Sequence, residues 1–206
     1  MADFAKSGDW PEVFMVLDDE KDWVLPYQWR PGGKGWFTVL HQAAWHGAPD
    51  HIVDKLIKRG ALRSLPDAKG RLPIDVACER GHPRLIPKLK PQKPTVDPQL
   101  LWEMNAPLKD LIYGFGSYLF DEYNPVGGHG NQARLSEILR CPPVEILPEL
   151  LRQRVWLQLP GTDAGFRITL LQGFLEVIAW NAELRAFGPT HVVTPDQTLP
   201  VDGGFI

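Results

Sequence analysis

The chain has 206 residues, which is long enough for two small domains or one larger domain. Hydrophobic residues make up 44% and charged residues 23%, values typical of a globular protein that can build a core. The net charge of -3 argues against direct binding to nucleic acid or to an anionic membrane, and no apolar run approaches the length of a membrane span.

The N-terminal sequence and the cysteines indicate a cytoplasmic protein. The first ten residues lack the basic-then-apolar order of a signal peptide. The two cysteines, Cys78 and Cys141, lie far apart and form no metal or redox motif, so we expect reduced thiols, with Cys78 in the core. We expect no cofactor. Residues 1–95 carry a net charge of +3 and residues 96–206 a net charge of -6, which suits two different surfaces.

Residues 1–30 predict two short helices followed by an apolar connection. The segment 4–9 matches the end of one helix, and Val13, Val16 and Leu17 form the apolar stripe of a second. The segment 23–29 is too apolar for a free linker, so we expect it to lie against the neighbouring helices.

Residues 34–92 contain a turn, a helix, a second turn and a second helix, and this pattern occurs twice. Three pairs of corresponding residues stand 34 positions apart: His41 and Asp75, Ala43 and Ala77, and Gly47 and Gly81. This spacing and the opening Thr38-Val-Leu-His resemble the ankyrin repeat.

The resemblance implies an ankyrin-repeat domain over residues 1–92, with a degenerate first repeat (1–30) and repeats at about 34–66 and 67–92. It also implies that His41 makes a structural hydrogen bond to a turn. An extra residue between Gly47 and Ile52 shifts the expected helix boundaries.

Prolines in residues 93–98 indicate a linker, and residues 99–206 predict a second domain of α+β type. An apolar stripe over 100–112 predicts a helix that is interrupted or kinked at Pro107. Residues 113–120 could form a helix or a strand, and 124–131 a loop. Segments 133–139 and 143–151 predict two short helices.

The last part of the chain predicts a small antiparallel sheet. Strands are expected at 155–159, 166–171, 174–180 and 191–194, with a hairpin at Gln172-Gly173. The fold class is therefore α+β, a short helical stack followed by an α+β domain. Residues 96–206 resemble no family that we can name.

The candidate site is the concave face of the repeats, formed by the turn tips and the first helices. We predict a protein partner there, because exposed Trp and Arg dominate protein–protein affinity. The predicted partner-binding residues are Trp36, Phe37, Gln42, Trp45, His46, Lys69, Arg71, Glu79 and Arg80. The alternative is that Trp36 or Trp45 packs against the C-terminal part of the same chain.

A second candidate site is the loop Gly127–Asn131. Glycines let backbone N–H groups approach a ligand, and a histidine between them could act near neutral pH. Its candidate catalytic residues are His129, Asp121, Glu122 and Asn131. A metal site is not expected, because the spacing of His41, His46 and His51 winds them around a helix.

The sequence is therefore compatible with three functions. The first is stoichiometric recognition or inhibition of another protein, as by a bacterial immunity protein or an anti-defence factor. The second is an enzyme whose active site lies near the Gly127–Asn131 loop, with the repeats as a targeting arm. The third is a structural subunit of a larger assembly.

Overall fold

The computed structural model describes residues 1–19, 25–29, 34–123, 135–136, 138–160, 162, 164–181 and 186–201, with only the backbone described at 118–123, 181 and 186. The chain divides into two compact units, Met1–Lys93 and Pro94–Ile206. The described part of the first unit contains helices and no strands, and the second unit combines helices with an antiparallel sheet. The predicted α+β fold class is confirmed.

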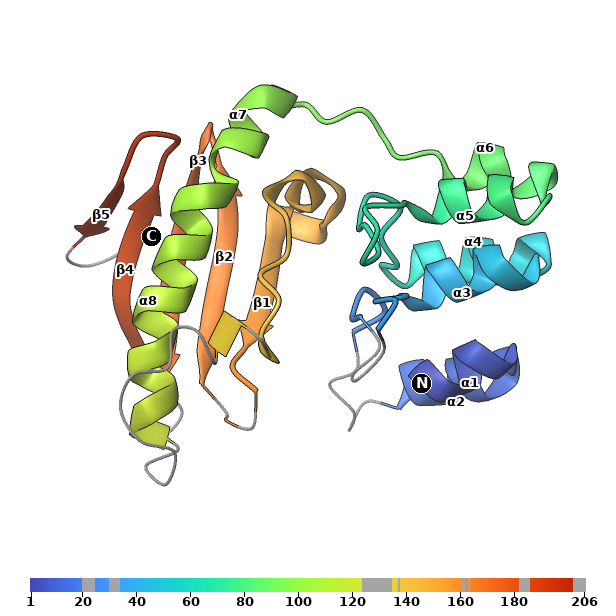
Figure 1. Cartoon of the computed structure of the whole chain (residues 1–206), viewed down its shortest axis with the longest axis horizontal. Coiled ribbons are helices and arrows are strands. Elements are labelled where there is room, and N and C mark those ends of the chain that lie inside the picture. The colour runs from blue at the N-terminus through green and yellow to red at the C-terminus, as the bar shows by residue number, and fades with distance from the viewer. Residues whose placement is uncertain are drawn as a thin grey trace. The chain divides into compact units, whose positions relative to one another are not determined.

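The first unit is a series of short helices that lie side by side (Figure 1). They are α1 (Ala2–Ser7), α2 (Trp10–Asp18), α3 (Val39–His46), α4 (Asp50–Lys58), α5 (Pro73–Glu79), the 3-10 turn η1 (Pro83–Leu85) and α6 (Ile86–Leu89). Helix α3 contacts α1 on one side and α5 on the other. Each helix pair therefore buries its apolar face against the next pair rather than around a single centre.

Local sequence determines where these helices begin and end. The Thr38 side chain accepts a hydrogen bond from the His41 backbone N–H at 3.4 Å, which caps the start of α3. Gly47 and Gly81 follow α3 and α5 with φ of 58° and 73°, a left-handed conformation that favours glycine. The 34-residue spacing thus places the same helix-ending device after two successive helices.

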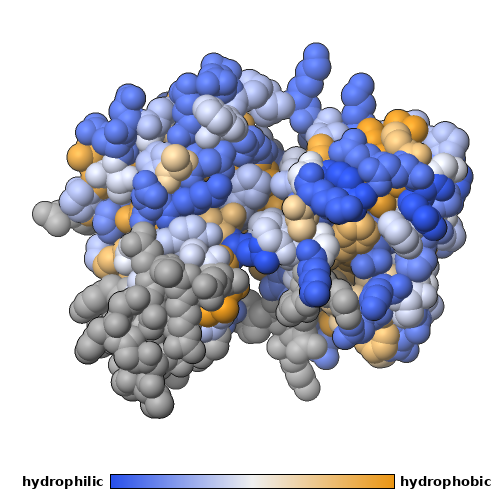
Figure 2. Space-filling model, in the orientation of Figure 1, coloured by the Kyte–Doolittle hydropathy of each residue, from blue (hydrophilic) through white to orange (hydrophobic). Residues whose placement is uncertain are grey.

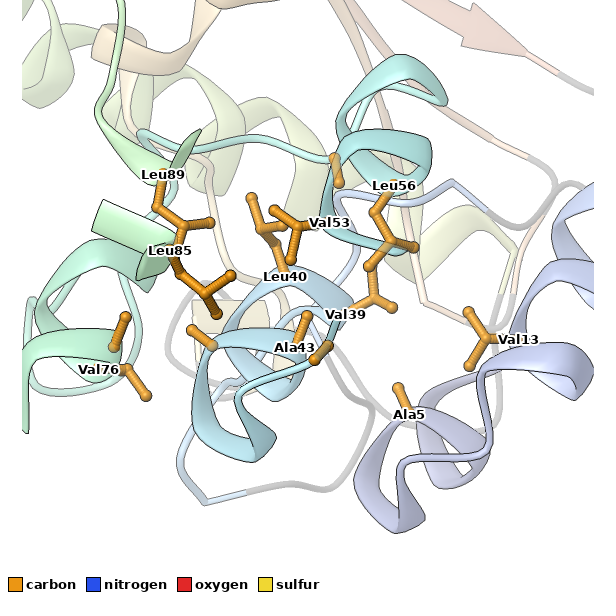
Figure 3. Close-up of a cluster of buried hydrophobic side chains, with 14 of the residues drawn as sticks. Ala5, Val13, Val39, Leu40, Ala43, Val53, Leu56, Val76, Leu85 and Leu89 are labelled. Atoms are coloured by element: carbon orange, nitrogen blue, oxygen red, sulfur yellow. The ribbon is translucent and has the colours of Figure 1, made fainter. Parts of the chain in front are cut away.

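The core of the first unit runs through all of its helix pairs (Figure 3). Leu40, Val53 and Leu56 are fully buried in the middle of it, between Val13 and Leu85. Burying a side chain of this kind stabilises the fold by roughly 1.5–3 kcal/mol. The segment 25–29 contacts the connection between α4 and α5, since the Trp29 indole N–H donates to the Pro66 carbonyl oxygen at 3.0 Å.

The helices of the second unit differ from the prediction in two places. They are α7 (Pro98–Glu103), α8 (Asn105–Tyr123) and the 3-10 helices η3 (Val144–Glu149) and η4 (Leu151–Gln153). The break falls at Met104 rather than at Pro107, because a proline in the first turn of α8 loses no helical hydrogen bond. Residues 113–120, for which helix and strand were both open, continue α8. The predicted helix at 143–151 is replaced by the 3-10 helix η3, with Pro148 inside, and the short η4 after Leu150.

Five antiparallel strands follow in the order β1 to β5. They are β1 (Arg154–Gln158), β2 (Gly165–Leu171), β3 (Phe174–Asn181), β4 (Ala186–Val193) and β5 (Thr198–Val201). The predicted hairpin is present, with Gly173 at φ 90°. Strand β5 and the first residues of β4 were not predicted, because Pro189 and Pro200 argue against strands, although an edge strand such as β5 tolerates a proline.

Helix α8 covers one face of the sheet (Figure 1). The Phe115 ring lies 6.2 Å from that of Phe166 on β2 and 5.7 Å from that of His191 on β4. At Gly116 an added Cβ would lie 3.0 Å from the Leu135 side chain, so α8 packs tightly there and a larger residue would require that side chain to shift. Among the described helices, none combines the length and the apolar character needed to cross a bilayer.

Candidate functional site

Five of the nine predicted partner-binding residues form one connected group, which we call the aromatic–arginine cluster: Phe37, Trp45, Arg71, Glu79 and Arg80. The ring of Phe37 meets that of Trp45 edge-on at 6.0 Å. The guanidinium of Arg80 lies over the Trp45 ring at 4.1 Å, and that of Arg71 lies 5.7 Å from the Phe37 ring. Arg71 also pairs with Glu79 at 2.5 Å. The cluster therefore joins a turn tip to the ends of α3 and α5.

A buried carboxylate beneath the cluster holds Arg71 in place. The side chain of Asp67 accepts hydrogen bonds from the backbone N–H groups of Lys69 (2.7 Å) and Arg71 (2.9 Å) and from Arg71 Nε (2.9 Å). Burial by itself would raise the pKa of Asp67, but these hydrogen bonds and the charge of Arg71 lower it. The turn thus keeps an ionised carboxylate under the guanidinium. The sequence predicts a turn at Asp67–Gly70, but not that the Asp67 carboxylate lies under the guanidinium of Arg71.

His41 ties α3 to the same turn. Its Nε2–H donates to the Arg71 carbonyl oxygen at 3.0 Å, and its Nδ1 accepts from the Thr38 hydroxyl at 2.8 Å. Its ring also stacks on that of Phe37 at 5.2 Å. Burial lowers its pKa from 6.5 to about 4, so the ring is neutral at physiological pH. The role is structural, as the family resemblance implies.

The cluster is accessible on its outer side. The Trp45 side chain is 38% exposed even though Phe37 and Arg80 contact it, and Glu79 and Arg80 are exposed as well. Phe37 and Arg71 are half-buried, and Lys69 projects from the neighbouring turn. Apolar areas on the side of the molecule seen in Figure 2 are separate from one another. The exposed Trp45 thus lies against a ring and a guanidinium, and the exposed Phe187 on β4 has the same kind of neighbours in Trp180 and Arg167.

Besides Lys69, three other predicted residues do not join the cluster. Gln42 is only 9% exposed, because its position on α3 is enclosed by the neighbouring helices, which corrects the prediction that it faces solvent. Trp36 has φ of 53° and its ring meets that of Trp29 at 5.9 Å. The His46 ring donates to the Lys6 carbonyl oxygen at 2.9 Å and meets the edge of Trp10. The rings of Trp36 and His46 therefore contribute to packing within the helical unit.

Cysteine placement also differs from the prediction. Cys78 is exposed on α5, whereas its neighbours Val76 and Ala77 fill the buried positions. Cys141 is buried, and burial raises the pKa of its thiol to about 12. Because the thiolate is the nucleophilic form, Cys141 is not suited to covalent catalysis.

The predicted catalytic loop lies outside the described residues. His129 and Asn131 fall in the range 124–134, and for Asp121 and Glu122 only the backbone is described, in the last turn of α8.

A second charged group, missed by the sequence analysis, lies on the face of the sheet opposite α8. The Glu176 carboxylate is 5% exposed and stands 3.8 Å from Arg167 Nη2. Among the described residues, Glu176 Oε1 and Arg167 Nε have no hydrogen-bond partner. The Arg167 guanidinium lies over the Phe187 ring at 4.6 Å. The signal in the sequence is a charged residue inside each of two apolar strands, β2 and β3.

This pair does not form an open binding site. Both unpaired atoms are sealed from solvent, so a ligand could not reach them without displacing the side chains around them. A buried, half-paired carboxylate costs free energy, and its effect is on the stability of the sheet.

Comparison of the chain with protein-family models, with curated proteins and with solved structures finds no match.

Proposed function

We propose that residues 1–92 form a short ankyrin-repeat stack and that the protein is a stoichiometric protein-binding module acting through the aromatic–arginine cluster. Two helix pairs of the same build support the repeat assignment, α3 with α4 and α5 with α6. Their closing glycines are 34 residues apart, and His41 bonds to the turn of the following pair. In such stacks the turn tips and first helices offer a continuous surface to a partner.

The observation that carries the proposal is the exposed indole of Trp45. Phe37 meets it from the side and Arg80 covers one face, so its conformation is fixed before any partner arrives. A side chain already held in place loses little entropy when a complex forms. Tryptophan and arginine in this arrangement are the residue types that contribute most to binding free energy at protein interfaces.

The experiment is the isolation of a complex from the native host. The tagged full chain is purified from lysate and its complexes are measured by native mass spectrometry. We expect one partner at near-stoichiometric yield, and a loss of at least tenfold in affinity for Trp45→Ala, about 1.4 kcal/mol or more. Met15→Ala is the matched control, because Met15 is an apolar residue that is 60% exposed on α2.

Unchanged capture by Trp45→Ala would contradict the proposal. Arg71 is not a suitable test residue, because its loss would leave the buried carboxylate of Asp67 without its cation. We further propose a cytoplasmic protein whose binding inhibits its partner, as an immunity protein or an anti-defence factor does. Co-expression with the identified partner, with and without Trp45→Ala, tests that inhibition.

A further inference from the structure

We infer that the partner of the aromatic–arginine cluster is an acidic protein segment, one that places a carboxylate next to an apolar side chain. The inference rests on the proposed protein-binding function and adds the chemistry of the partner. It follows from which charged groups around Trp45 are already engaged and which are not.

The carboxylates on this surface are engaged. Asp67 is buried under Arg71. Asp75 accepts from the Leu72 backbone N–H at 2.8 Å, where it caps the start of α5. Glu79 is paired with Arg71. Each of these acids therefore serves the turn or the helix that carries it.

Two cations on the same surface remain available. Lys69 at the turn tip and Arg80 at the end of α5 are exposed, and within the described part of the chain neither forms an ion pair. The Arg80 guanidinium instead lies over the Trp45 ring, 4.1 Å from the ring centroid. A guanidinium without an ion pair keeps its N–H donors for a partner, and their planar arrangement matches a carboxylate in a bidentate geometry.

Cations on the second helices of the same unit have a different environment. Arg59 pairs with Asp18, Arg84 with Asp50, and Lys88 with Asp54 at 2.7 Å. These ion pairs connect neighbouring helix pairs, and they leave less positive charge for a binding partner. Within the described part of this unit, the available positive charge next to an exposed aromatic ring is thus on the Trp45 surface.

Together these observations define the partner. An aliphatic or aromatic side chain of the partner covers the exposed indole of Trp45, and a neighbouring Asp or Glu pairs with Arg80, with Lys69 attracting further negative charge. A basic segment would meet two unpaired cations at this surface, and like charges at an interface oppose binding.

Selection from a displayed library of random linear peptides, with the full chain as the target and the Trp45→Ala chain as the counter-target, tests the inference. We expect enriched peptides to carry Asp or Glu beside an aromatic or aliphatic residue. Lys69→Glu and Arg80→Glu should each weaken the binding of a synthesised, enriched peptide about tenfold, and higher salt should weaken that binding further. Arg80→Lys, which keeps the charge, should lose less than Arg80→Glu.

Lys58→Glu is the matched control, since it makes the same change in net charge at an exposed position on α4. We expect it to alter affinity less than twofold, because exposed charges beyond about 10 Å are screened. Enrichment of basic or uncharged peptides would overturn the acidic partner and leave the proposed function standing. No enrichment over the Trp45→Ala chain would count against the proposed function itself, and the inference would fall with it.

Discussion

Each unit of the molecule buries one carboxylate beside an arginine, and the two are held very differently. The side chain of Asp67 is 1% exposed and that of Glu176 is 5% exposed. Asp67 accepts two backbone N–H groups and lies 2.7 Å from Arg71 Nη2. Glu176 is 3.8 Å from Arg167, and among the described residues its Oε1 has no partner.

The difference comes from the backbone around each acid. A tight turn directs several N–H groups toward one point, and the Asp67 side chain occupies that point. On β3 the N–H groups are used by the neighbouring strands, so only side chains can reach Glu176. The backbone N–H groups of a turn can therefore offset the cost of burying a carboxylate, whereas those of a strand within a sheet cannot. The proposed binding surface rests on the turn.

The largest expected effect is the loss of the turn carboxylate. Asp67→Ala removes the acceptor of two backbone N–H groups and leaves the guanidinium of Arg71 half-buried without its main partner. We expect the free energy of unfolding to fall by about 3–5 kcal/mol. Urea denaturation of the full chain measures the change, and hydrogen exchange by mass spectrometry shows whether α3 and α5 lose protection.

Glu79→Ala is the control for this measurement. It removes the other acid paired with Arg71, but Glu79 is half exposed, so we expect a cost below about 1 kcal/mol. If the two substitutions lowered the free energy of unfolding equally, the buried Asp67 would contribute no more than the exposed Glu79. The proposed contrast between the turn and the strand would then be wrong.

The next effect is a pH dependence that is largest in the helical unit. Burial also lowers the pKa of His191 on β4, so the stability of the sheet unit falls with pH in the same direction. The pKa of His41 is about 4 in the fold and 6.5 ordinarily, so between these values the unfolded chain binds more protons. Stability from His41 is therefore complete above pH 6.5 and is lost as the pH falls toward 4, by about 3 kcal/mol in total. The lowered pKa of Asp67 keeps that group ionised through most of this window.

Urea denaturation at a series of pH values, with hydrogen exchange to locate the affected unit, measures this dependence. His41→Gln should lower stability at pH 7 and reduce the slope between pH 6.5 and 4. Thr38→Val removes the hydroxyl bonded to His41 Nδ1 and should lower stability while keeping most of the slope. An unchanged slope in His41→Gln would assign the dependence to other groups.

The helical unit and the sheet were predictable to different degrees. In the first unit the 34-residue spacing marks the helix pairs, because each helix is built from neighbouring residues and closed by its own glycine. Strands at the middle of the sheet were predicted within a residue or two from their alternating apolar pattern. Strand β5 was missed, because its pairing with β4 outweighs the proline at position 200.

The candidate site was predictable as a list of residues but not as a set of contacts. Repeat spacing indicated Trp45, Glu79 and Arg80, and the contacts among them depend on the distance between α3 and α5. Gln42 was assigned to the wrong environment for the same reason, since its burial depends on neighbouring helices rather than on its own. The predicted hairpin fixes the register that sets Glu176 opposite Thr169, but the contact of Glu176 with Arg167, two residues further along β2, depends on side-chain conformations that the sequence pattern does not give.

A smaller effect is expected from breaking the pair on the sheet. Arg167→Ala leaves the buried carboxylate of Glu176 without its cation, and we expect a loss of about 2 kcal/mol. The loss is smaller than for Asp67→Ala because the native pair is long and Arg167 is partly exposed. Hydrogen exchange should show it in β2 and β3 while α3 and α5 keep their protection. Met15→Ala, on the other unit, is the control for a change without a buried charge.

The smallest effect is expected when both members of the sheet pair are replaced. Arg167→Met with Glu176→Leu removes two charges and two unpaired polar atoms from a surface that includes Ile178 and Val192. We expect unfolding free energy within about 1 kcal/mol of the parent chain, because a buried pair with poor geometry contributes little net stability. The parallel change in the turn, Asp67→Leu with Arg71→Met, should cost several times more, because the backbone N–H groups of Lys69 and Arg71 would lose their acceptor inside the fold. Equal costs for the two double substitutions, measured by urea denaturation, would mean that the backbone donors of the turn contribute nothing beyond the ion pair.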